Sequence, residues 1–476
     1  MHQLVSANLD SSRRWWVLAT VVAAQFMFGV DAFVVNVAIP TISVELHASP
    51  AQIESVIAIY LIAYATLVVT GGRLGDIYGT KPVFIAGVLG FTLTSLWCGL
   101  AQSGPELILA RLAQGATAAL MVPQVLATLH LLFSDSARSR AFAIYGIVLG
   151  LAGAAGFALG AILVTLNLAG LGWRAVFFVN VPFGVLILVA AARIMPQVPR
   201  RTGTRLDIPG AIVLFVGLLC LIGPLLFGHD AHWSPWVFMV MAMGVAIMAA
   251  LLRLERRVAR RGGMPLIDLS LVSDHPFIRG LCAVFFFFFA NLSFYLVVTL
   301  FMQQGLRIPP LQAGLVFMPL ALTFVVASRR SGIRAKHRGP LVLVEGCAIQ
   351  IAGLAALALT SVVMPTASML ALVLMIFGYG QGLVMAPLSG MVLSSVKAAA
   401  AGSGAGLYGT VTQIGNAAGV AAIGAVFFAL KQDSPSDALF AALSLCALSI
   451  VTCVVFLTWM RRAADSSLSA RNNHEV

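Results

Sequence analysis

Residues 52–82 read Q52IESVIAIYLIAYATLVVTGGRLGDIYGTKP82, an apolar run that ends in a short segment rich in glycine and charge. About 20 consecutive apolar residues are enough for a helix to cross the hydrocarbon core of a bilayer. The run 52–71 therefore predicts a membrane-spanning helix, and the segment after it predicts a tight connection at the membrane surface.

The same pattern of a long apolar run and a short connection recurs along the whole chain. Fourteen runs qualify as spans, at about 15–39, 52–71, 83–100, 107–132, 141–165, 176–194, 209–227, 235–253, 280–301, 311–327, 340–360, 369–392, 403–430 and 438–460. They are far longer than the ~9–11 residues of a barrel strand and do not alternate in polarity. We therefore expect an all-α integral membrane protein with 14 transmembrane helices.

Composition supports a membrane protein. Of the 476 residues, 60% are hydrophobic and 10% charged, whereas soluble domains average ~45–50% apolar and ~25% charged residues. The net charge of +12 would suggest nucleic acid in a soluble protein. Here the basic residues lie in short connections between spans, so we expect them to face lipid headgroups of the bilayer rather than nucleic acid.

The distribution of basic residues predicts the orientation. With the N-terminus in the cytoplasm, 25 of the 29 Lys and Arg residues fall on the cytoplasmic side. The outer segments hold Arg174, Arg307 and Lys431, and Arg111 falls inside a span. Because cytoplasmic loops carry the excess of Lys and Arg, we expect the N-terminus (1–14) and the tail (461–476) to be cytoplasmic, in a multi-pass protein of the cell membrane.

The two longest and most charged connections, 193–206 and 253–279, suggest how the spans are grouped. We expect an N-terminal six-helix bundle (15–194), a linker region with two extra helices (195–279) and a C-terminal six-helix bundle (280–460). The segments 72–82 and 328–340 stand at equivalent places in the two halves, and both carry basic residues followed by glycine and proline. Paired six-helix halves are a recurrent architecture of transporters.

The charges inside the predicted spans are the first candidates for function. We expect two intramembrane acids, Asp31 and Glu345, and one base, Arg111. Each such charge costs ~2.5–3.5 kcal/mol on insertion scales. Asp31 lies ~12 Å below the outer end of its span and Arg111 ~6 Å below the outer end of its own, so the two side chains can pair.

Two interpretations of this pair stay open: a structural ion pair, or a carboxylate that exchanges a proton or a cationic substrate under the influence of Arg111. Glu345 lies ~8 Å from the cytoplasmic face and can reach it, so its role in transport is equally open. With no second acid expected in the outer half of any span, we expect neutral or monocationic substrates to be preferred over dications.

Two further sets of residues are candidates. Polar side chains near the middle of the spans can line a cavity or merely link helices: Gln25, Asn36, Gln124, Asn291, Gln350, Gln381, Gln413 and Asn416. Glycines in the fifth span can let helices approach closely and slide: Gly146, Gly150, Gly153, Gly156 and Gly160. A similar run occurs at 402–424 in the second half, which favours a moving interface.

Other chemistries lack support in the sequence. The six cysteines form no CxxC pair, so neither a disulfide framework nor a zinc site is indicated. His229, Asp230 and His232 share one connection without the further ligands that a metal site needs. A phosphate-binding GxxxxGK[ST] loop and a nucleophile–base constellation are both missing. We expect no enzyme activity, no metal and no cofactor.

Several motifs resemble those of the major facilitator superfamily, over about residues 15–460. G72RLGDIYGTK81 is similar to the superfamily signature G-x-L-a-D-r-x-G-r-k. Four other segments resemble motifs of its fourteen-helix drug:proton antiporter branch: D31AFVVNVAIP40, R111LAQG115, W173RAVFFVNVPFG184 and Q303QGLRIPPLQAGLVFMP319. One segment departs from the branch, because G156FALGA161 stands where the antiporter motif reads G-P-x-x-G-G.

The resemblance implies roles for particular residues. Arg73 and Asp76 would belong to a charge-relay lock on the cytoplasmic side, within a gating loop formed by Gly72, Arg73, Gly75, Asp76, Gly79 and Lys81. Arg111 would assist proton exchange, and Asp31 would couple protons to substrate. Lys336 stands where the second half of the family has an acid, so the lock would be one-sided.

The leading hypothesis is a proton-coupled exporter of small amphipathic compounds, such as drugs, toxins or metabolites, that works by alternating access. We expect its partners to be protons, a small-molecule substrate and the bilayer, and its working unit to be a monomer. Two alternatives stay open: a uniporter or symporter for a metabolite, favoured by the altered fifth-span motif, and a non-transporting membrane receptor, for which a soluble domain would be expected.

Overall fold

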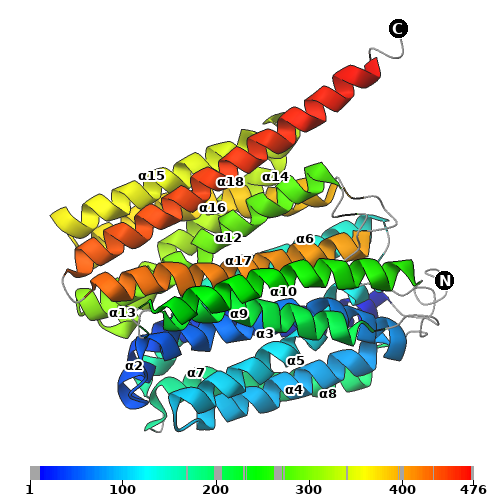
Figure 1. Cartoon of the computed structure of the whole chain (residues 1–476). Helices are drawn as coiled ribbons and strands as arrows, with labels where there is room; N and C mark the ends of the chain where they lie inside the picture. Colours follow the sequence, from blue (N-terminus) through cyan, green and yellow to red (C-terminus); the bar gives the residue numbers. More distant parts are fainter. Residues whose placement is uncertain are drawn as a thin grey trace. The chain divides into compact units, whose positions relative to one another are not determined.

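The computed structural model describes residues 11–133, 135–167, 170–197, 206–228, 231, 233–261, 271, 274–338, 341–394, 396, 401–431 and 434–472. Every regular element in these ranges is a helix (Figure 1). Fourteen of the helical segments are long and apolar enough to cross a membrane. The predicted number of spans and the all-α class are therefore confirmed.

Two compact units make up the chain, the first formed by residues 1–266 with 308–315 and the second by 267–307 with 316–476. The helices of the first unit are α2 (Ser11–Glu45), α3 (Pro50–Tyr78), α4 (Thr80–Leu100), α5 (Gly104–Leu132), α6 (Asp135–Leu166), η2 (Gly172–Arg174), α7 (Ala175–Phe178), α8 (Asn180–Ile194), α9 (Ile208–Phe227) and α10 (Pro235–Arg260), with most of α13 (Pro310–Val316).

The second unit contains α12 (His275–Leu300), η3 (Phe301–Gly305), α14 (Met318–Arg338), α15 (Leu341–Val363), α16 (Ala367–Ser394), α17 (Ala401–Leu430) and α18 (Pro435–Asn472). Both units repeat one packing scheme. In the first, α2 packs on α6, and α5 on both α3 and α4; in the second, α12 packs on α17, and α16 on both α14 and α15. The internal repeat suggested by the sequence is thus present in the helix contacts.

The segment predicted as a gating loop is mostly helical, which corrects the prediction. Helix α3 begins at Pro50 with a capping box between Ser49 and Gln52, and continues through Asp76 to Tyr78. Only Gly79 separates it from α4, and its φ of 95° lies in the region where a side chain would be strained. The glycines that suggested a loop are tolerated in α3 because α5 packs closely against it.

Helix α6 lies against α2 through some of the predicted packing glycines. A Cβ on Gly156 would stand 2.7 Å from Phe33 Cβ and 2.9 Å from the Val30 carbonyl oxygen, and one on Gly160 would stand 2.8 Å from the Val34 carbonyl oxygen. A Cβ on Gly153 would stand 3.5 Å from the Phe33 ring, which is an ordinary contact distance. Gly146 differs, because nothing lies within 4 Å of the place its Cβ would take.

This contrast gives a stability prediction with a control on the same helix. Gly156→Ala should destabilise the protein by about 1–3 kcal/mol, because the added methyl group forces α2 and α6 apart. Gly146→Ala should leave stability unchanged or raise it by up to about 1 kcal/mol, since Ala favours helix over Gly. Thermal unfolding midpoints of the purified variants in detergent check both; equal midpoints for the two variants would contradict the packing argument.

Candidate functional site

Asp31 of α2 and Arg111 of α5 form an ion pair in the interior of the first unit. Arg111 Nη1 donates to Asp31 Oδ2 at 2.6 Å, and the two side chains are 1% and 0% exposed. The pairing that the sequence allowed is present. Away from water, two such charges are stable only when their remaining hydrogen-bonding capacity is also satisfied.

Neutral side chains from three other places in the chain complete the surroundings of Asp31. Its Oδ1 accepts hydrogen bonds from Gln114 Nε2 at 3.0 Å and Asn180 Nδ2 at 2.9 Å. Both amides also donate to Ser95 Oγ, at 2.8 and 3.3 Å. These contacts join α2, α4, α5 and α8 around one carboxylate. The surroundings of Asp31 therefore depend on how these four helices pack.

Arg111 is held on several sides. Its Nη1 also donates to Gln114 Oε1 at 2.6 Å, and its Nε donates to the Val56 carbonyl oxygen at 3.2 Å. The guanidinium carbon lies 4.0 Å from the centre of the Tyr60 ring, a cation–π contact with α3. A movement of α3 relative to α5 would therefore change the contacts of Arg111 and, through them, those of Asp31.

The motif W173RAVFFVNVPFG184 positions Asn180. The short helix α7 ends at Phe178 and α8 begins at Asn180, so the amide stands at the start of a new helix. Glu45, the last residue of α2, fixes the other end of the motif: Glu45 Oε2 accepts from Trp173 Nε1 at 2.8 Å and from Arg174 Nη1 at 2.9 Å. This motif thus joins the end of α2 to the site.

Helix α2 is longer than the span predicted for it. Helix α2 does not end at Ile39 but continues past Pro40 to Glu45. Asp31 is therefore fourteen residues from the end of the helix, or ~21 Å instead of ~12 Å at 1.5 Å per residue. The predicted run ended before Pro40, whereas membrane helices tolerate an internal proline.

The prediction that the spans hold only two acids is wrong. Glu54 lies in α3 with 1% exposure and Glu255 lies in α10 with 0% exposure. Glu54 was visible in the sequence, since it falls inside the predicted run 52–71. Because Glu54 lies near the end of α3 that we expect to face outward, we no longer expect dications to be disfavoured as substrates.

Glu345 has a different environment from Asp31. It lies in the first turns of α15 in the second unit, with 31% of its side chain exposed. It accepts from Arg334 Nη1 at 3.1 Å and Arg338 Nη1 at 3.5 Å. These arginines belong to the end of α14, so the carboxylate joins two consecutive helices at a partly exposed position.

The signature segment makes specific contacts with neighbouring helices. Lys81 Nζ donates to the carbonyl oxygens of Ala192 and Met195, both at 2.8 Å, and so caps the end of α8. Gly75 lies directly against the Gln124 side chain, whose Nε2 donates to the Gly71 carbonyl oxygen at 2.8 Å. A Cβ on Gly72 would stand 3.8 Å from Pro123 Cβ of α5, an ordinary contact distance. Gln124 therefore links α3 to α5 in this conformation.

The other polar candidates fall into two groups. Gln25, Asn36, Asn291, Gln350 and Gln381 are buried, whereas Gln413 and Asn416 are partly exposed. Asn36 donates within its own helix, and Asn416 donates to Gln413 at 3.3 Å. Whether any of them lines a cavity stays a prediction.

The second unit carries a neutral counterpart of the ion pair. Tyr295 is the twenty-first residue of α12, as Asp31 is of α2. Tyr295 Oη donates to Gln381 Oε1 of α16 at 2.8 Å. The helices that are joined by a buried ion pair in the first unit are thus joined by uncharged groups in the second.

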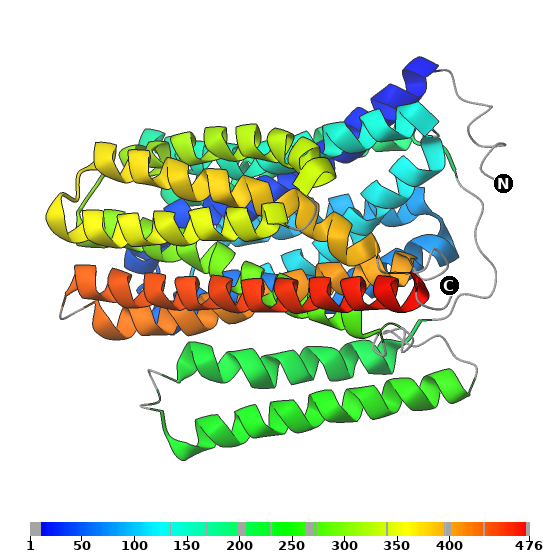
Figure 2. The ribbon, with the colours of Figure 1, turned by 90° about the horizontal axis from the view of Figure 1, so that it is seen from above.

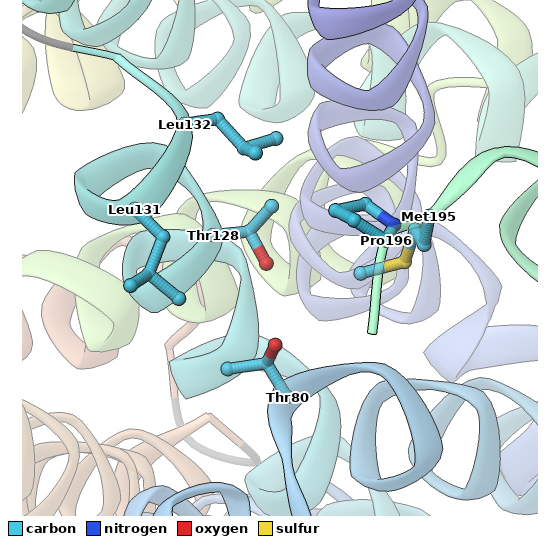
Figure 3. A pocket seen from close by; sticks show the side chains of 6 residues that line it. All are labelled: Thr80, Thr128, Leu131, Leu132, Met195 and Pro196. Atoms are coloured by element: carbon cyan, nitrogen blue, oxygen red, sulfur yellow. The ribbon is translucent and has the colours of Figure 1, made fainter. Parts of the chain in front are cut away.

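A small pocket lies apart from this site, between the start of α4, the end of α5 and the segment after α8 (Figure 3). It is lined by Thr80, Thr128, Leu131, Leu132, Met195 and Pro196. The empty space between its lining atoms amounts to about 180 Å³, but no part of it is wide enough for a water molecule. We therefore assign it no ligand. His229, Asp230 and His232 lie outside the described residues.

Comparison with known proteins identifies the class. A model of the Major Facilitator Superfamily matches residues 21–212 and, in a second match, residues 208–420. The chain is 35% identical to the probable actinorhodin transporter of Streptomyces coelicolor, over 88% of this chain and 73% of that protein. It is 33% identical to a cephamycin export protein of Amycolatopsis lactamdurans, over 87% and 85% of the two chains.

The chain therefore belongs to the Major Facilitator Superfamily of membrane transporters. Its fourteen candidate spans and its relatives place it in the fourteen-helix drug-transporter branch, as the motifs predicted, and in the cell membrane as a multi-pass protein.

Solved structures agree on the fold. An auto-inhibited peptide transporter of the POT family aligns with a TM-score of 0.68 at 14% identity, over 95% of this chain and 97% of that one. A bacterial homologue of the human lysosomal transporter Spinster, inward-facing and occupied, aligns with a TM-score of 0.66 at 15% identity, over 96% and 98%. At this identity the likeness concerns the fold alone.

Proposed function

We propose that this protein is a proton-coupled exporter of small amphipathic organic molecules that works by alternating access. The observation that carries the proposal is the buried Asp31–Arg111 pair, surrounded by neutral amide and hydroxyl groups from α4, α5 and α8. When a buried carboxylate gains or loses a cationic partner, its proton affinity changes. Such a carboxylate can therefore bind and release one proton during transport.

The contacts of Arg111 suggest how the proton and the conformation are linked. In this conformation the carboxylate accepts hydrogen bonds on both oxygens, from Arg111, Gln114 and Asn180. If α3 moved relative to α5, the contacts of Arg111 with Val56 and Tyr60 would change and its hold on Asp31 would weaken. A buried carboxylate without a cation favours its protonated form. The protonation of Asp31 and the packing of these helices would thus change together.

The membrane potential can supply energy for this change in the proton affinity of Asp31. A shift of two units in proton affinity corresponds to ~2.7 kcal/mol. One elementary charge crossing 100 mV supplies ~2.3 kcal/mol. The energy of one proton crossing the membrane is therefore comparable with the energy of the switch. The neutral Tyr295–Gln381 contact in the second unit supports a single coupling site in the first.

The substrate class rests on the relatives and on the side chains around the site. The names of the relatives refer to the export of cephamycin, to resistance to puromycin and to the transport of actinorhodin. Where α2 approaches α3, the ring of Phe28 stacks on that of Tyr60 and packs at a tilt against that of Tyr64. Aromatic surface beside a single ion pair suits organic molecules of mixed polarity better than sugars or inorganic ions.

A resistance profile tests the proposal. Cells that overexpress the protein should resist some members of a panel with puromycin, a cephamycin and an aromatic polyketide, and an uncoupler should abolish both this resistance and the efflux of the same compounds. An unchanged profile across the panel would refute the export of such compounds, and resistance that persists with an uncoupler would refute proton coupling.

One observation favours the alternative of a uniporter or symporter. Phe157 replaces the proline of the antiporter motif, and its ring packs 5.6 Å from that of Phe33 on α2. The fifth span therefore has no proline kink at this position. The alternative predicts that an inward proton gradient either leaves the substrate flux unchanged or drives it inward, whereas the proposed exporter moves substrate outward.

Asp76→Asn should impair transport without preventing membrane insertion. Asp76 lies in the last turn of α3, where the helix dipole disfavours an acid, and Arg73 stands one turn before it. The amide keeps the size of the side chain and removes the charge that would favour one of two conformations. We expect efflux to fall about 5- to 30-fold, as for a loss of 1–2 kcal/mol. Efflux equal to the wild type at matched expression would exclude a gating role.

A further inference from the structure

The two helices α9 and α10, which the sequence placed between the two bundles, belong to the first unit. They run side by side as an antiparallel hairpin (Figure 2). Helix α9 also packs on α3. One face of α10 is exposed through Trp236, Phe238, Met239 and Met243. The hairpin therefore contacts the rest of its unit through α9 and through the side of α10 that is not exposed.

Two carboxylates converge at the start of α9. Asp207 Oδ1 accepts from the Gly210 amide at 2.9 Å and so caps the helix. Glu255 of α10 is fully buried and reaches the same turn. The place that a Cβ of Gly210 would take lies 2.5 Å from Glu255 Oε1 and 2.7 Å from Asp207 Oδ2. The missing side chain of Gly210 thus leaves the space in which both acids meet.

Arg73 of the signature segment interacts electrostatically with both acids. This side chain is half-buried near the end of α3, the helix on which α9 packs, and its charge interacts with those of Asp207, Glu255 and Asp76. Buried acids are strongly destabilising unless they are compensated, so a cation at this place favours the docking of the hairpin on α3.

We propose that Asp207 and Glu255 form an acidic clasp, through which the α9–α10 hairpin holds Arg73 and with it the end of α3 that begins the signature segment. This inference rests on the proposed alternating-access function. The hairpin then acts as a working part of the gate, because any movement that turns the end of α3 must either carry the hairpin along or break the clasp. Asp207 and Glu255 are positioning residues and touch no substrate.

The test measures the accessibility of the end of α3 in the full-length protein. Tyr78, which is 53% exposed, is replaced by Cys in a background where the partly exposed Cys220 and Cys282 are Ser. The reporter is the rate at which a polar maleimide labels Tyr78→Cys. Neither a substrate nor a proton gradient is needed, so failure of the clasp and failure of proton coupling at Asp31 give separate results.

We expect Arg73→Gln and Glu255→Gln to change the labelling rate in the same direction, each by at least about threefold. The double variant should change it no further than Arg73→Gln alone, because both remove one interaction. Glu255→Asp, which keeps the charge, should label more nearly like the reporter protein. Arg256→Gln, at the adjacent and exposed position on α10, is the matched control and should have no effect.

Several results would overturn the clasp. Labelling of Glu255→Gln and Asp207→Asn at the rate of the reporter protein would do so, as would effects of Arg73→Gln and Glu255→Gln that multiply in the double variant. An equal effect of Arg256→Gln would show that the change does not arise from the buried acids. If Glu255→Gln does not purify as a monodisperse protein, Asp207→Asn carries the same test, because it removes the other charge of the clasp.

Discussion

Asp31→Asn is expected to lower gradient-driven substrate accumulation in membrane vesicles about 100-fold. This factor corresponds to the ~2.7 kcal/mol of a two-unit switch in proton affinity. Asn has nearly the same size as Asp and can keep contacts with Gln114 and Asn180, but it cannot take up or release a proton. Binding of a neutral substrate should persist, because the shape of the site is retained.

One control separates coupling from stability. Asp31→Asn leaves Arg111 as a buried cation without its counter-charge, which alone can cost 3–5 kcal/mol. The double variant Asp31→Asn, Arg111→Gln removes both charges and should fold at least as well as the single variant, yet still lack coupling. Glu345→Gln should retain transport, since Glu345 is partly exposed and paired with two arginines. Full gradient-driven efflux by Asp31→Asn, together with its loss in Glu345→Gln, would place the proton site on α15.

Arg111→Lys is expected to lower the maximal rate of transport about 10- to 100-fold, although the positive charge is kept. Arg111 donates to Asp31, Gln114 and the Val56 carbonyl at once, and its guanidinium carbon lies 4.0 Å from the centre of the Tyr60 ring. Lys has one compact ammonium group and cannot reproduce this arrangement. The KM for a neutral substrate should change little, because the loss concerns the switch and not substrate contacts.

Tyr60→Phe is the matched control for this variant. The Tyr60 hydroxyl is buried without a hydrogen-bond partner among the described residues, so Phe keeps the ring beneath the guanidinium and removes nothing else. Transport by Tyr60→Phe should stay within about twofold of the wild type. Rates for Arg111→Lys that match those for Tyr60→Phe would show that the geometry of the guanidinium is unimportant.

The sequence predicted the parts of this molecule that follow from hydropathy. Spans are read from single runs of the chain, so their number was recovered. Asp31 and Arg111 could be paired for two reasons. Charges are rare in apolar runs, and both residues were predicted to lie near the outer ends of their spans. Glu54 was equally visible in the run 52–71 and was overlooked.

The neutral residues of the site could not be found in this way. Ser95, Gln114 and Asn180 are ordinary polar residues, and their convergence on Asp31 depends on how α4, α5 and α8 pack. Asn180 is 149 positions from Asp31 in the chain. Pro182 indicates a helix break close to Asn180, but it does not indicate that the amide reaches Asp31. The same reason hid the clasp, since Glu255 meets Asp207 only because α9 and α10 pack as a hairpin around Gly210.

The central claim is that Asp31 exchanges a proton as substrate binds. Its most direct measurement uses purified protein in weakly buffered detergent solution with a pH indicator, and a compound selected by the resistance profile. Adding the compound should release close to one proton per molecule of wild-type protein and none from Asp31→Asn. Equal release from wild type and Asp31→Asn, or no release from a wild-type protein that binds the compound, would contradict the account.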